Sequence, residues 1–157
     1  MNIVRAIARP CLASVFIWGG IDALRKPHGR AEKASPVLDK IKSATPLPAD
    51  DVMLVRINSA VQIGAGFMLA TSRFPRLASL ALAGSLVPTT IAGHAFWNVD
   101  SENKPMQKTQ FAKNLSVLGG LLLAVADTAG KPSLSWRLHH ITTPDVHLGK
   151  PDWLPTH

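Results

Sequence analysis

The chain has 157 residues, a formal net charge of +7 and 46% apolar residues, a size that suits one domain. Its single cysteine, Cys11, excludes an intrachain disulfide and any chemistry that needs a CxxC pair. The basic residues flank apolar runs and form no nucleic-acid motif, so the charge favours an anionic lipid surface and excludes nucleic acid as a partner. Polar residues gather at residues 25–51, 98–113 and 131–157, which leaves apolar segments between them.

The first apolar segment predicts a helix over residues 4–24. Its uncharged centre, from Pro10 to Ile21, would measure about 18 Å as a helix, which is short for a bilayer. The segment can still span if the side chains of Arg5 and Arg9 reach outward to the interface. Because further apolar segments follow, we expect an uncleaved transmembrane helix and not a signal peptide.

Residues 25–51 are predicted to form a long polar loop. Prolines argue against one continuous helix over this segment, and they stand at Pro27, Pro36, Pro46 and Pro48. Val37, Leu38 and Ile41 can form a short amphipathic turn that lies on the membrane surface.

The second helix is expected over residues 52–71. Asp50 and Asp51 precede it, and acidic residues favour a helix N-terminus through capping and the helix dipole. Asn58 and Gln62 lie four residues apart, so they share one face and give this helix a polar side.

The third helix is expected over residues 75–97. Residues 77–99 contain no Lys, Arg, Asp or Glu, and as a helix they would measure about 34 Å, enough to cross a hydrocarbon core of about 30 Å. Pro75 suits the first turn, because its φ is already fixed at a helical value. The stretch also carries His94, the one histidine inside an apolar run.

The fourth helix is expected over residues 110–129, and a Pro-rich polar tail follows at residues 131–157. The expected fold is therefore all-α: a four-transmembrane-helix bundle at residues 1–130, with a long polar loop between its first two helices. Both termini then lie on one side of the membrane. Basic residues are equally numerous at the two ends, but the compact Arg73–Arg76 loop is the harder one to translocate, which favours cytoplasmic termini.

Five residues are expected near one end of this bundle: Asp22, Arg25, Arg56, His94 and Trp97. A charged side chain at bilayer depth costs about 3 kcal/mol, so it normally pairs or faces water. Asp22 and Arg25 lie three residues apart on one helical face and can pair with each other. The cluster predicts either a salt bridge that fixes the helices or a site for a lipid headgroup or another ligand.

His94 has two interpretations. It can hydrogen-bond a neighbouring helix, or it can bind the carbonyl of a quinone, because imidazole exchanges a proton near neutral pH. Phe96 and Trp97 would then form apolar walls for the ring, or they belong to an interfacial aromatic belt. Quinone is the one cofactor this pattern admits. A bis-histidine haem needs a second intramembrane histidine, and the histidines of the tail match no standard zinc spacing.

Three segments resemble landmarks of the DoxX family: FIWGGIDALRKP at the end of the first helix, AGHAFWN at the end of the third, and FAKNLSVLGGLLLAVAD for the fourth. The resemblance covers residues 4–130, and the long loop and the tail are extensions outside the family pattern. It implies an integral bacterial membrane protein linked to redox biology. Family members were named for a quinol oxidase or a thiosulfate–quinone pathway, and some are associated with superoxide detoxification and thiol homeostasis. The resemblance supplies no catalytic residues.

We therefore expect an accessory or anchoring subunit of a redox or respiratory system in the bacterial inner membrane, with no catalytic activity of its own. Its partners would be membrane lipids and other membrane or redox proteins, and it can form oligomers. One alternative is a quinone-reactive oxidoreductase subunit with a site near His94. Another is a small transporter or lipid-binding protein that uses the same five residues.

Overall fold

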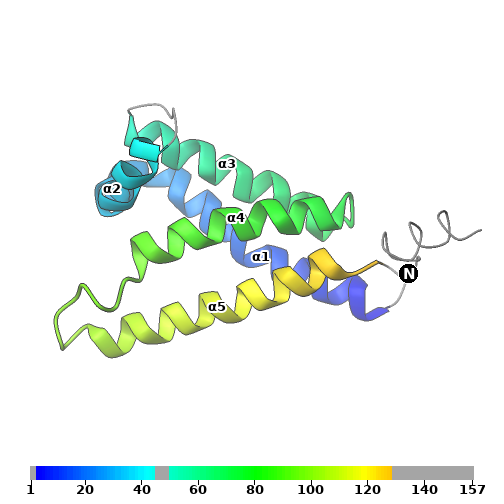
Figure 1. The fold of residues 1–157 in the computed structure, drawn as a ribbon. Helices are drawn as coiled ribbons and strands as arrows, with labels where there is room; N and C mark the ends of the chain where they lie inside the picture. The colour runs from blue at the N-terminus through cyan, green and yellow to red at the C-terminus, as the bar shows by residue number, and fades with distance from the viewer. Residues whose placement is uncertain (1–2, 45–49, 129–157) are drawn as a thin grey trace, which may run out of the picture. The chain divides into compact units, whose positions relative to one another are not determined.

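The computed structural model describes residues 3–44 and 50–128 of the chain. These residues form five α-helices and contain no strand, which confirms the all-helical prediction. The helices, shown in Figure 1, are α1 (Ile3–Arg25), α2 (Pro27–Ala44), α3 (Asp51–Ala70), α4 (Pro75–Gly93) and α5 (Lys104–Ala126).

The four longer helices run up and down in succession, and α4 lies between α3 and α5. Helix α1 packs mainly against α3, and it meets α5 over a small area. The start of α1, the turn at residues 71–74 and the end of α5 lie at one end of this bundle, here called the Asp127 end (Figure 1). At the opposite end, here called the α2 end, α2 lies across the long helices and packs on α3 and α4.

Two glycines bring α1 and α3 into close contact. A Cβ atom on Gly20 would lie 2.8 Å from Ile63 Cγ1 and 3.0 Å from the carbonyl oxygen of Ser59. A Cβ atom on Gly66 would lie 2.7 Å from Ile17 Cγ1. The absence of both Cβ atoms lets the two helices approach, which increases dispersion contact where lipid offers no hydrophobic driving force.

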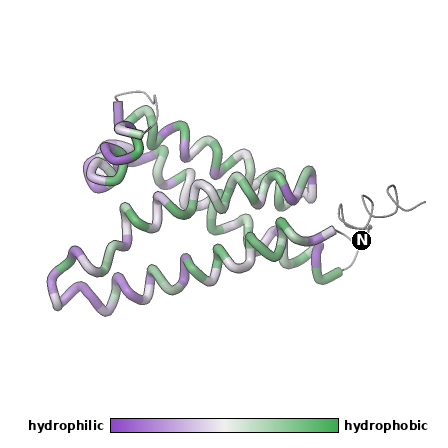
Figure 2. The backbone as a smooth tube through the Cα atoms, viewed as in Figure 1, coloured by the Kyte–Doolittle hydropathy of each residue, from purple (hydrophilic) through white to green (hydrophobic). Residues whose placement is uncertain are grey.

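The core takes side chains from all four long helices. Its largest fully buried apolar residues are Leu69, Leu82 and Leu121, and Phe16 lies beside them. Large apolar side chains also cover the outside of the bundle, since Leu80, Leu122 and similar residues are exposed. Figure 2 shows this apolar character along the long helices, whereas the α2 end is hydrophilic.

Three of the described helices, α1, α3 and α5, are long and apolar enough to cross a membrane. Helix α4 is not among them, although the uncharged stretch at residues 77–99 gave the strongest membrane prediction. The helix ends at Gly93, and it carries Ser79, Ser85 and Thr90 as buried polar residues. Helix α4 contacts α2, α3 and α5, and hydrogen bonds to α3 and α5 satisfy two of these buried hydroxyl groups, those of Ser85 and Thr90.

The segment predicted as a long polar loop is helical over Pro27–Ala44, so this prediction was wrong for most of its length. Pro27 occupies the first helical position, where a missing N–H costs nothing. Pro36 lies inside the helix and forgoes one hydrogen bond, but packing of α2 on α3 and α4 compensates for the loss. The two later prolines lie in residues 45–49, outside the described residues.

Ion pairs connect the end of α2 to the start of α3. Lys42 Nζ lies 2.9 Å from Asp39 Oδ1 and 2.8 Å from Asp51 Oδ1. Hydrogen bonds to Asp51 and Asp39 raise the pKa of Lys42 above its ordinary value. The stabilising contact is therefore fully present at neutral pH and is lost only as pH rises through that raised pKa.

The last two helices differ from their predicted bounds because of contacts made outside them. Helix α4 ends at Gly93 and not at residue 97, because the chain turns there and places Phe96 against Phe111 of α5. Helix α5 begins at Lys104 and not at residue 110, since Pro105 lies in its first turn, where proline is tolerated.

The close α1–α3 contact predicts opposite effects for two adjacent glycines. Gly20→Ala should destabilise the protein by about 1–3 kcal/mol, because the new Cβ clashes with Ile63 and with backbone of Ser59. A Cβ atom on Gly19 would meet no atom within 4 Å, so Gly19→Ala should be neutral or stabilising, since alanine favours the helix. Thermal unfolding in detergent micelles, followed by circular dichroism, measures both variants. Equal stability of the two would contradict the close contact.

Candidate functional site

The five predicted site residues all lie toward the α2 end, but they take different partners. Asp22, in the last turn of α1, forms an ion pair with Arg30 of α2 and not with Arg25. The carboxyl group lies within hydrogen-bond distance of Arg30 Nη2. Both side chains of this pair are about half exposed, so the contact positions α2 against α1 without burying a charge.

Arg25 and Arg56 are exposed, and neither makes a hydrogen bond or ion pair with another described residue. The side chain of Arg56 projects from the outer side of α3, in the first half of the helix, and is exposed. Its charge therefore needs no partner inside the bundle. The structure therefore does not join Asp22, Arg25 and Arg56 into one polar cluster.

His94 directly follows α4, and its backbone N–H bonds to the carbonyl of Thr90. Its Nδ1 lies 2.8 Å from Oε1 of Gln107, in the first turn of α5. Because an amide oxygen only accepts, Nδ1 carries the proton, and Nε2 of a neutral ring is left as an acceptor. This contact fits the prediction that the histidine hydrogen-bonds a neighbouring helix. It also leaves one ring nitrogen for a further ligand.

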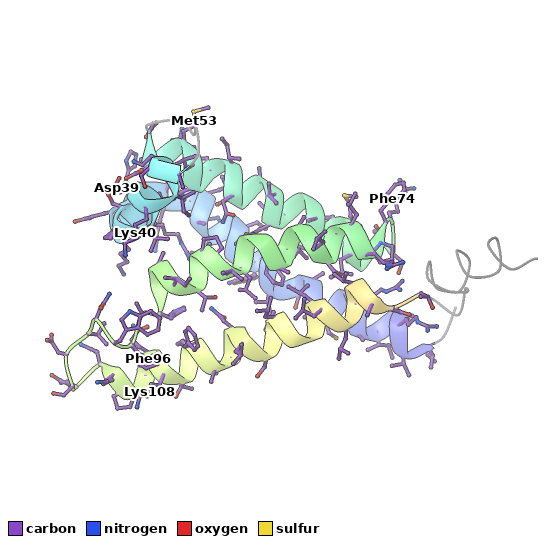
Figure 3. The ribbon with its side chains drawn as sticks, in the orientation of Figure 1. Asp39, Lys40, Met53, Phe74, Phe96 and Lys108 are labelled. Carbon is purple, nitrogen blue, oxygen red and sulfur yellow. The ribbon has the colours of Figure 1, made fainter. Side chains whose placement is uncertain are left out.

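An aromatic trio lies beside this histidine. The ring centroids of Phe96, Trp97 and Phe111 are 5.0–5.9 Å apart, and all three contacts are edge-to-face. Lys108 Nζ lies 5.8 Å from the centre of the Phe96 ring, at cation–π distance. Figure 3 labels both residues at the same end of the bundle. Trp97 is 51% exposed. The trio thus has an apolar inner part and an accessible outer edge.

The sequence predicted only part of a buried polar network that joins α3 and α4. Ser85 Oγ donates to Asn58 Oδ1 at 2.8 Å and accepts from Gln62 Nε2 at 2.9 Å. The four-residue spacing of the two amides predicts their shared face, but nothing local indicates Ser85 as their partner. Between α4 and α5, Asn114 Nδ2 donates to Thr90 Oγ1 at 3.0 Å. These bonds fix the three helices in register.

At the Asp127 end, one carboxylate holds two arginines of α1. Asp127 Oδ2 lies 2.8 Å from Arg5 Nε and 3.1 Å from Arg9 Nη2. Arg76 donates from Nε to the carbonyl oxygen of Val125 at 2.7 Å. The sequence predicted outward-reaching side chains for the two arginines of α1. It gave no signal for their shared partner more than a hundred residues later.

With the fold and these contacts in view, one comparison identifies the family. The protein-family model named DoxX matches residues 4–95, more than half of the 157-residue chain. The chain belongs to the DoxX family. No curated protein and no solved structure matches it.

The DoxX match has different limits from the predicted resemblance. It includes residues 25–51, which were expected to lie outside the family pattern, and it ends just after His94. Helix α5 of this DoxX protein, with its FAKNLSVLGGLLLAVAD segment, therefore lies outside the matched range. The family match and the apolar helices together show a membrane protein.

Metal binding has no support in the described part of this DoxX protein. No group of three or more His, Cys, Asp or Glu side chains comes together within residues 3–44 and 50–128. The tail histidines, His139, His140 and His147, lie outside the described residues.

The buried network gives a prediction for stability. Ser85→Ala should lower the free energy of unfolding by about 1 kcal/mol, because it leaves the two amide side chains without their common partner. Ser116→Ala is the matched control, since the exposed Ser116 bonds only to a carbonyl of its own helix. Thermal unfolding in detergent measures both. A loss no greater than that of the control would show that the network carries no stability.

Proposed function

We propose that this DoxX protein is an accessory or anchoring subunit of a membrane-associated redox or respiratory system, concerned with oxidative stress or thiols, in the bacterial inner membrane. The observation that carries the proposal is the DoxX match over residues 4–95. The protein would act through its partners, with both termini on the cytoplasmic side.

In this proposal α4 is the fourth membrane-spanning helix. Helices α1, α3 and α5 can span by length and composition, and α4 runs antiparallel to α3 and α5 between them. A helix enclosed by spanning neighbours can carry the buried hydroxyl groups of Ser85 and Thr90, because α3 and α5 satisfy them by hydrogen bonds and exclude lipid. The four long helices then form one transmembrane bundle.

The α2 end is the surface through which we expect redox partners to bind. Helix α2 exposes charges of both signs, among them Glu32, Lys33, Asp39 and Lys40. Asp39 and Lys40 point away from the bundle in Figure 3. A surface of mixed charge on a helix fixed across the bundle is suited to electrostatic recognition of another protein.

Copurification tests this proposal. The protein extracted in mild detergent should carry proteins that contain flavin, haem or iron–sulfur groups, detected by visible absorbance and peptide mass spectrometry. Lys40→Glu should remove most of these partners, because it reverses a charge on the proposed surface. Arg73→Glu reverses a charge at the opposite end and should retain them. A preparation free of redox proteins would count against the proposal.

A quinone-reactive site near His94 is a second candidate function, and one observation favours it. The imidazole of His94 is held by Gln107, and its Nε2 is left as an acceptor. Trp97, three residues later, is exposed at its outer edge and packs edge-to-face on Phe96. Nε2 of His94 would accept a hydrogen bond from the hydroxyl group of a quinol, and with a proton on Nε2 it would donate to the carbonyl of a quinone, while the aromatic rings contact the quinone ring.

His94→Ala tests this second candidate. Quinone-dependent oxidation by membranes that contain the protein should fall to the background rate, while the amount of inserted protein stays unchanged. His28→Ala is the control, because this exposed histidine lies on α2 and touches none of the aromatic trio. Unchanged activity of the His94 variant would exclude the site.

A further inference from the structure

Among the described residues, the Asp127 end carries more positive than negative side chains. Four arginines lie there: Arg5, Arg9, Arg73 and Arg76. Asp127 is the one acidic residue at this end within the described part of the chain, since the other described acids lie in α2, next to it, or in the loop at residues 94–103. A surplus of cations beside an apolar bundle attracts an anion, because the low dielectric strengthens the attraction.

The two arginines of α1 are fixed in place. Arg5 and Arg9 lie one helical turn apart on the same face, and both reach the same oxygen, Asp127 Oδ2. The side chain of Arg9 is only 8% exposed and that of Asp127 is 21% exposed. A guanidinium has five N–H donors, and this single contact uses one donor from each arginine.

Arg76 adds a third guanidinium beside the last turn of α5. Its Nε–H is used by the carbonyl oxygen of Val125, two residues before Asp127. That hydrogen bond holds the arginine against the helix end and leaves its terminal amino groups for another acceptor. Arginines from α1 and α4 therefore flank the same helix end.

We propose that Arg5, Arg9 and Arg76 bind a phosphate group, carried by an anionic lipid or present as free phosphate. The guanidinium geometry matches phosphate oxygens and allows two parallel hydrogen bonds from one side chain. Arg5 lies within the first turn of a membrane-spanning helix, at the depth where lipid phosphates lie. Asp127 positions the two α1 arginines and reduces their mutual repulsion. This site is independent of the redox role.

The test measures lipid binding by the full chain with native mass spectrometry in detergent, using phosphatidylglycerol, phosphatidylcholine and inorganic phosphate as probes. The protein should retain phosphatidylglycerol and release phosphatidylcholine. Arg9→Gln should weaken phosphatidylglycerol binding about tenfold, the effect of losing a charge-assisted hydrogen bond. Lys33→Gln removes one positive charge at the α2 end and should leave binding unchanged.

The variant Asp127→Asn distinguishes a phosphate-binding site from an ion pair that only stabilises the fold. It removes the negative charge that competes with the phosphate and keeps a side-chain oxygen that accepts from the arginines of α1, so phosphatidylglycerol should bind more tightly, a change that misfolding would not produce. Competition by inorganic phosphate would assign the site to free phosphate, and its absence would assign the site to lipid. The proposal is overturned if both lipids bind equally, if Lys33→Gln weakens binding as much as Arg9→Gln, or if Asp127→Asn weakens it.

Discussion

Hydrogen bonds from α4 to its neighbours are the interactions on which the bundle depends. Ser85 bonds to two amides of α3, whereas Thr90 and His94 bond to side chains of α5. Arg76, at the start of the same helix, reaches a backbone carbonyl near the end of α5. In an apolar medium these bonds supply the specificity that burial of apolar side chains cannot, because lipid is as apolar as leucine. They hold α4, the long helix with the most buried residues, to the helices on either side of it.

This arrangement divides the molecule into two chemically different ends. The α2 end carries acids and bases together, the aromatic trio and a histidine with one ring nitrogen left as an acceptor. The Asp127 end carries arginines that outnumber the acids among the residues described. A mixed-charge end is suited to proteins, and a cationic end to anionic headgroups. The proposed subunit role and the proposed phosphate site therefore use different surfaces of the same bundle.

Local sequence signals predicted the elements whose ends depend on local chemistry. Asp50 caps α3 through its side chain, and Pro75 starts α4, both as the residue types indicate. Helix α2 was missed because its packing, not its propensity, offsets Pro36. Asp22 forms its ion pair with Arg30 and not with Arg25 for a similar reason, since Arg30 becomes a partner only once α2 has formed. Contacts between distant segments cannot be read from spacing along one helix.

The two glycines at the α1–α3 contact impose different limits on how related sequences can change. The one atom that would clash with a Cβ on Gly66 is Cγ1 of Ile17, at 2.7 Å, so a smaller residue at position 17 would make room. A Cβ on Gly20 would meet the backbone oxygen of Ser59 as well as Ile63, and no substitution moves a backbone oxygen. In this chain, a smaller residue at position 17 can therefore accommodate a Cβ at position 66, whereas a Cβ at position 20 requires the two helices to move apart.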